Sequence, residues 1–202
     1  GRKLWALAST GQDLKLKGND LVKSYLLLAT SCDGTLCTTA QFTSLRVVCN
    51  NTLQMALRNS SGAVKVSHST TFDPAIVKEE LGLGIAHWDE FKTQTKALAQ
   101  RPVAPEEALR FFSDLLAQPL DDENIILTRP VQRLYELYQG AGMGSDLSSS
   151  RNTAWGLVNA VTEYVDHHRR ARSQDHRLDS AWFGQGAQLK SQALNQALNL
   201  LQ

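Results

Sequence analysis

Residues 22–48, VKSYLLLATSCDGTLCTTAQFTSLRVV, decide the fold of this chain. Both flanks of this stretch, 22–30 and 38–48, are rich in the aliphatic, aromatic and threonine residues that favour strands. Between them lies Asp33-Gly34, and a tight hairpin turn needs the positive φ that glycine and aspartate tolerate. The stretch therefore predicts two antiparallel strands joined by a short turn.

Further strands are predicted on both sides of this hairpin. Residues 4–8 are apolar throughout, and residues 63–71 alternate apolar with polar side chains, the pattern of a strand with one wet face. Between 48 and 63, Asn50 or Asn51 is predicted to cap a short helix that ends at Gly62, because an asparagine oxygen accepts a bond from an orphan helix amide. Residues 1–72 are thus predicted to form an antiparallel β-meander with one packed helix.

From Pro74 onward the sequence has the periodicity of helices. Apolar side chains recur at spacings of three and four, and Pro130 stands where a first helical turn tolerates proline. The stripes comprise Ile85, Trp88, Phe91, Thr95 and Leu98, then Leu109, Phe112 and Leu116, and then Val131, Leu134, Leu137 and Tyr138. Residues 140–151 combine glycine with serine and are predicted to form a flexible loop. We therefore expect one α+β domain over residues 1–202, with a mainly helical part over 73–202.

Charge is distributed unevenly along the chain. Residues 1–70 carry eight basic and three acidic side chains, whereas residues 73–124 carry five basic and eleven acidic ones. A basic first third can form a surface for a polyanion, and two oppositely charged parts can equally attract each other.

The cysteines and the hydropathy indicate a compartment. Cys32, Cys37 and Cys49 are odd in number and lack a C-x-x-C spacing, so neither a disulfide framework nor a four-ligand zinc site is expected. No apolar run is long enough to cross a bilayer, and no secretory leader is visible. We therefore expect a protein of the reducing cytoplasm without a membrane span.

The junction between residues 46 and 52 is a candidate anion contact. A strand that runs into a helix would place free backbone N–H groups and the positive end of the helix dipole beside Arg46. The phosphate-contact hypothesis then includes Arg46, Asn50 and Asn51. Helix capping alone also explains the two asparagines.

Residues 152–170 carry a second candidate site. Asn152 or Thr153 can cap a helix with one packed face, and Glu163, Asp166 and His167 lie on its polar face. Glu163 and His167 are separated by four residues, close enough on a helix for an ion pair or for two metal ligands. A solvated polar stripe explains the same spacing. The arginines that follow, Arg169, Arg170 and Arg172, could bind phosphate, or could simply complement the helix dipole.

Three strings carry a resemblance to a known family. They are GRKLWALA at residues 1–8, RVVCNNTL at 46–53 and TAWGLVNAVTEYVDH at 153–167. Together they resemble the phage/plasmid-like protein family, which is classed as a domain of unknown function, and the match spans nearly the whole chain. The setting of that family implies work on mobile DNA.

In outline, the predicted architecture is similar to that of single-strand annealing proteins, which hold the nucleic-acid backbone in a basic groove. This analogy implies a cofactor-independent homo-oligomer that binds DNA, in single strands more than in duplex. The candidate groove comprises Arg2, Lys3, Lys23, Arg46 and Arg58, with Arg169, Arg170 and Arg172 as a second contact.

Two other classes of function stay open at this point. An enzyme could use Glu163, Asp166 and His167, with His168 as a further candidate, for metal-assisted or acid–base chemistry on nucleic acid. No Ser-His-Asp order, nucleophile elbow or phosphate-binding glycine loop supports that class. An interaction protein could instead bind a host partner through its acidic middle and the amphipathic helix predicted over residues 187–201.

Overall fold

A five-stranded antiparallel sheet forms the first part of the computed structural model, which describes residues 3–54, 63–69, 73–118 and 127–202. Its strands are β1 (Lys3–Lys15), β2 (Leu21–Ser31), β3 (Thr38–Arg46), β4 (Asn51–Gln54) and β5 (Ala63–Val66). The 3-10 turn η1 (Lys17–Asn19) joins β1 to β2. The hairpin predicted at Asp33-Gly34 is confirmed, since β2 pairs with β3 from Val22↔Arg46 to Ala29↔Thr39.

Two short strands share one edge of β3. Residues 43–46 of β3 pair with β4, and residues 38–41 pair with β5. β4 and β5 therefore both lie beside β3, β4 along its last residues and β5 along its first.

The helix predicted from Asn50 or Asn51 is wrong where the structure describes it. Asn50 ends a turn with φ of 54°, and Asn51 begins β4. Asparagine tolerates this left-handed conformation, and the reversal lets the next four residues pair with β3 instead of satisfying their backbone groups within a helix. Residues 55–62, which include Arg58 and the predicted end at Gly62, lie outside the described residues.

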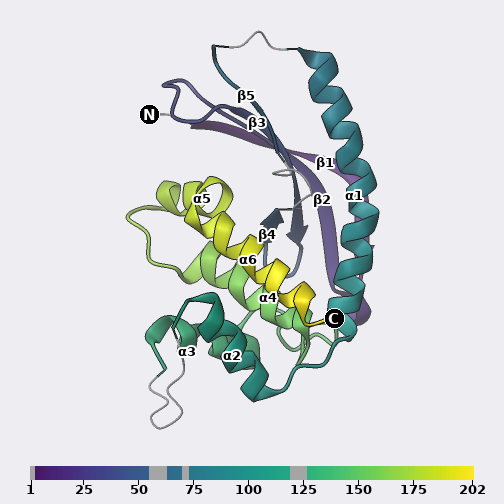
Figure 1. Ribbon diagram of the computed structural model, residues 1–202, viewed down its shortest axis with the longest axis vertical. Coiled ribbons are helices and arrows are strands. Elements are labelled where there is room, and N and C mark those ends of the chain that lie inside the picture. Colours follow the sequence, from purple (N-terminus) through teal and green to yellow (C-terminus); the bar gives the residue numbers. More distant parts are fainter. Residues whose placement is uncertain (1–2, 55–62, 70–72, 119–126) are drawn as a thin grey trace.

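The second part of the chain is helical, as predicted, so the fold class is α+β. The helices are α1 (Pro74–Gln100), α2 (Pro105–Leu115), α3 (Arg129–Glu136), α4 (Ala154–Glu163), α5 (Gln174–Phe183) and α6 (Gln185–Asn199). Two π-helical turns, η2 (Leu137–Ala141) and η3 (Tyr164–His168), follow α3 and α4. Figure 1 shows α1 along one side of the sheet and the group of α4, α5 and α6 on the other.

Most residues of the predicted apolar stripes lie in the core. Trp88, Phe91, Thr95 and Leu98 of α1 are buried, and so are Phe112, Val131, Leu134, Leu137 and Tyr138. The side chain of Ile85 lies outside the described ones. Among the described helices, none combines the length and the apolar character needed to cross a membrane.

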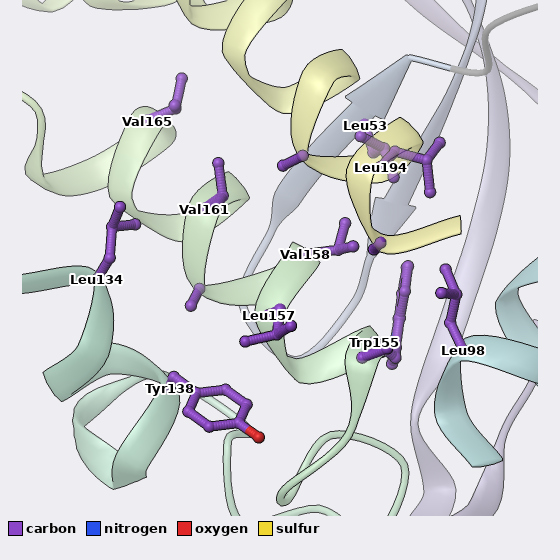
Figure 2. Packing of buried hydrophobic residues seen from close by; sticks show 14 of the residues in the cluster. Leu53, Leu98, Leu134, Tyr138, Trp155, Leu157, Val158, Val161, Val165 and Leu194 are labelled. Carbon is purple, nitrogen blue, oxygen red and sulfur yellow. The ribbon is translucent and has the colours of Figure 1, made fainter. Parts of the chain in front are cut away.

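Helix α4 is the centre of the core. The sequence predicted one packed and one polar face, but every residue of α4 is buried. Leu134 and Tyr138 lie on one side of this helix, and Leu53, Leu98 and Leu194 lie on the other (Figure 2). The polar residues are satisfied internally, because Asn159 donates to the carbonyl of Trp155 at 2.8 Å and Thr153 Oγ1 accepts from the amide of Gly156 at 3.1 Å.

A buried carboxylate joins the sheet to the helical part. Asp20, which is fully buried between η1 and β2, accepts from Arg46 Nε at 2.7 Å, from Ser149 Oγ at 2.7 Å and from Trp155 Nε1 at 3.3 Å. Arg46 in turn donates from Nη2 to Ser150 Oγ at 2.7 Å and to the carbonyl of Gly144 at 3.0 Å. We call these side chains the Asp20 node.

The node holds one end of the predicted flexible loop, 140–151, in the interior. Ser149 and Ser150 are each 1% exposed, and a Cβ at Gly156 would lie 2.1 Å from the carbonyl oxygen of Ser150. The rest of the loop is exposed or half-buried, and Met143 is 47% exposed.

Substitution of Arg46 by lysine tests the node. Lysine keeps the charge, but one ammonium group cannot reproduce a guanidinium that bonds three partners at fixed angles. We expect Arg46→Lys to lower the free energy of unfolding by roughly 2 kcal/mol or more, since hydrogen bonds to charged groups contribute about 1.5–3 kcal/mol each. Urea denaturation measures the change, with exposed Arg110→Lys as the charge-matched control. Equal stability of the two variants would contradict this role.

Candidate functional site

The carboxylate of Asp166 is held by a buried polar cluster. Its Oδ1 accepts from Lys190 Nζ at 2.9 Å, and its Oδ2 accepts from the backbone amide of Thr52 at 2.8 Å. The hydroxyl of Thr52 also donates to Oδ2 at 3.2 Å, while it accepts from Lys190 Nζ at 3.0 Å and from Trp182 Nε1 at 3.2 Å. We call Thr52, Asp166, Trp182 and Lys190 the Lys190 cluster.

Burial dominates the electrostatics of this cluster. Lys190 is 1% exposed, and desolvation lowers the pKa of its ammonium group although the charge of Asp166 opposes that shift. Each polar group of the cluster has a protein partner. The cluster therefore connects β4, η3, α5 and α6. Because its hydrogen bonds engage both oxygens of Asp166, this carboxylate has little capacity for chemistry on a ligand.

The spacing of Glu163 and His167 predicted a contact that the structure does not form. The π turn η3 inserts one residue, so that the amide of Arg169 bonds the carbonyl of Tyr164, five residues earlier, at 2.6 Å. His168 therefore approaches Glu163 at 3.6 Å, while His167 Nε2 lies 3.1 Å from the carbonyl oxygen of Cys49.

The carboxylate of Glu163 is already engaged by a backbone amide of the protein. It is buried, and its Oε2 accepts from the backbone amide of Met143 at 2.9 Å. Among the described residues, no group of three or more His, Cys, Asp or Glu side chains could hold a metal ion. Nothing in this geometry brings Glu163, Asp166 and His167 together as one reactive set.

The residues of the predicted basic groove are not assembled in the described part of the chain. Arg46 is committed to the Asp20 node, and Asn51 is 3% exposed, with its side-chain amide buried and without a hydrogen-bond partner among the described residues. Asn50 is exposed, Lys23 is half-buried across from Asp13 on β1, and Lys3 pairs with Asp179 on α5. Arg2 and Arg58 lie outside the described residues.

The second predicted contact is an exposed basic segment, which we define as residues 169–177. It holds four arginines and one aspartate. Arg170 and Arg172 are exposed, whereas Arg169 and Arg177 are partly buried. Arg170 lies beyond the end of η3, outside the turn that holds Asp166 and His167.

Two guanidinium groups of the basic segment have spare donors. Arg169 Nη2 donates to Gln185 Oε1 at 3.4 Å, and Arg177 Nη1 donates to the carbonyl of His167. Arg169 Nη1 and Arg177 Nε are buried without a hydrogen-bond partner among the described residues. The side chains of this segment that a ligand can reach are therefore those of Arg170 and Arg172, which are exposed.

A cleft of about 420 Å³ lies between the sheet and the last two helices. Strands β3 and β5 form one wall, α6 forms the other, and the end of α5 closes the cleft. The amide, cationic and aromatic side chains that line it are Gln41, Lys65, Trp182, Phe183, Gln188 and Gln192. We call it the amide cleft. The sequence analysis missed it, although the spacing of Gln188 and Gln192 by four residues places both on one helix face.

The Lys190 cluster can be tested by a double-mutant cycle. Lys190→Met leaves the carboxylate of Asp166 buried without its countercharge, and we expect a loss of about 3–5 kcal/mol of unfolding free energy. Asp166→Asn alone should also destabilise the protein, and the double variant should lose less than the sum of the two. Chemical denaturation measures the cycle, with exposed Lys96→Met as the control. Additive losses would show that the two residues are not coupled.

Comparisons with known proteins place the chain in a family. No curated protein and no solved structure matches it. A family model described as "Domain of unknown function (DUF932)" matches residues 1–182, which include the whole sheet, the central helix α4, the basic segment and all of α5 except its last residue. The chain therefore belongs to the DUF932 family of domains of unknown function.

Proposed function

We propose that this protein binds single-stranded DNA through the basic segment, without a cofactor, as an annealing-type accessory of recombination. The observation that supports this proposal is the density of arginines in residues 169–177, four within nine residues, of which two are exposed. Arg170 and Arg172 are exposed, and Arg169 and Arg177 each keep a donor without a partner among the described residues. Arginine binds phosphate through planar, paired hydrogen bonds, and sequence-independent binding of single strands uses such contacts.

The surroundings of the segment contain a further arginine, Arg133, which is paired with Glu136 at 3.1 Å. Arg133 Nη2 lies 3.5 Å from His168 Nδ1, next to the start of the segment. Asp179 forms an ion pair with Lys3, and this pairing weakens its repulsion of a phosphate nearby. Aromatic rings lie close by, because Trp182 and Phe183 end α5, the helix that begins within the segment.

The proposal has three further parts, which concern the mobile element, self-association and the compartment. Work on a phage or plasmid follows from the resemblance of the sequence alone. Self-association is supported by β1, an edge strand on which Leu4 and Trp5 are exposed. A reducing cytoplasm agrees with the free thiols of Cys32 and Cys37, which are both exposed.

Fluorescence anisotropy of labelled oligonucleotides tests the proposal. We expect binding of a single strand that is tighter than binding of the matching duplex and that weakens between about 50 and 200 mM salt, because bound phosphates release counterions. Arg170→Ala/Arg172→Ala should weaken binding and should flatten the plot of log affinity against log salt by about 0.7 for each lost phosphate contact.

The matched control removes the same charge elsewhere. Lys96 and Arg110 are exposed on α1 and α2, so Lys96→Ala/Arg110→Ala lowers the net charge equally without touching the segment. Absence of binding at low salt would contradict the proposal. Equal weakening in the two double variants would contradict the assignment to residues 169–177.

A further inference from the structure

The floor of the amide cleft contains a buried amide with a free acceptor. Gln41 is 6% exposed, and its Nε2 donates to the carbonyl of Trp182 at 3.4 Å. Among the described residues, none donates a hydrogen bond to Gln41 Oε1. The Oε1 atom itself is not fully buried, so it can accept a hydrogen bond from a group that enters the cleft.

The aromatic wall of the cleft is fixed in place. Trp182 donates from Nε1 to Thr52 in the Lys190 cluster, and the ring of Trp5 packs edge-on against it, with 4.6 Å between centroids. Phe183 stands nearly perpendicular to Trp182, at 84° and 6.3 Å. Trp182 is only 8% exposed, so the half-buried Phe183 is the more accessible ring of this wall. Aromatic rings suit a flat, conjugated ligand, and bases rest on such side chains in single-strand binding proteins.

The opposite wall presents amide groups. Gln188 and Gln192 are exposed on consecutive turns of α6 and make no side-chain hydrogen bond within the described part of the chain. An amide offers a donor and an acceptor side by side, and this pairing matches the edge of a nucleobase. Lys65, on β5 across the cleft, is also without an ion pair among the described residues, and it could approach a phosphate.

The cleft adjoins the proposed DNA contact. Gln185, at the start of α6, accepts from Arg169 of the basic segment, and Gly184 lines the cleft. The volume, about 420 Å³, lies at the lower end of the range for small-molecule sites and suits one nucleotide better than a longer fragment. A strand held along the basic segment could therefore place one base into the cleft.

We propose that the amide cleft is a nucleobase subsite, in which Gln41, Gln188 and Gln192 bond the edge of one unpaired base beside Trp182 and Phe183. This inference rests on the proposed function and deepens it, because a base within a duplex has its pairing edge occupied. The subsite thus accounts for a preference for single strands over duplex, whereas the basic segment alone would bind both.

The experiment compares a normal single strand with one of the same length that carries abasic sites. The test variant is Gln188→Ala/Gln192→Ala, and the control is Asn195→Ala/Asn199→Ala, which removes two exposed amides at the same spacing from the same helix. We expect the test variant to bind the normal strand about tenfold more weakly, which corresponds to the loss of one or two hydrogen bonds. Its affinity for the abasic strand and its salt dependence should equal those of the unmodified protein.

Other outcomes overturn the inference without affecting the proposed function. If the unmodified protein binds the normal and abasic strands equally, or if the test variant binds the normal strand as the control does, then the cleft holds no base. Salt-sensitive binding through Arg170 and Arg172 would still stand in that case.

Titration with free nucleoside monophosphates, followed by tryptophan fluorescence, separates the remaining cases. If no oligonucleotide binds, but a monophosphate quenches the fluorescence and the test variant abolishes that effect, then the base subsite stands and the DNA-binding proposal fails. If neither ligand binds, both are wrong.

Discussion

The buried carboxylate of Asp20 is the constraint on which the rest of the structure depends. It lies where β1 turns into β2, and its three donors come from β3, from the loop before α4 and from α4 itself. A carboxylate without solvent is tolerated only when its oxygens are bonded and its charge is balanced. Sheet, loop and central helix must therefore come together in one arrangement, since any other would leave Asp20 or Arg46 buried and unpaired. The same requirement explains why Ser149 and Ser150, at the end of a loop rich in glycine and serine, are buried.

The sequence was informative where local chemistry decides the structure. The Asp33-Gly34 hairpin, the start of α1 at Pro74 and the cap at Thr153 each depend on residues within one turn of each other. Asn51 shows the opposite case, because its neighbours fit a helix start equally well and only the pairing of β4 with β3 decides between the two. The π turn at residues 164–168 likewise depends on tertiary contacts, and a shift of one residue was enough to exchange His168 for His167 beside Glu163.

The candidate site was predictable only in part, because residue type does not reveal burial. Arg46 and Arg170 are the same side chain, yet one balances a buried carboxylate and the other is exposed. Clustering in the sequence distinguishes them better than charge does, since Arg170 belongs to a group of four arginines within nine residues, whereas Arg46 has no basic neighbour nearby in the sequence. The amide cleft left no comparable signal, because glutamine is common on helix surfaces and Gln41 becomes significant only through its burial against Trp182.

The Asp20 node and the Lys190 cluster stabilise different parts of the molecule, and this difference matters for binding. The Asp20 node fixes the helical part against the sheet, whereas the Lys190 cluster fixes Trp182, and with it the wall of the amide cleft. Trp182 has its indole N–H and its backbone carbonyl engaged, by Thr52 and by Gln41 respectively. A ring that is ordered before the ligand arrives loses little conformational entropy on binding. The energetic cost of burying Lys190 is therefore consistent with a role in preorganising a surface against which a flat ligand can rest.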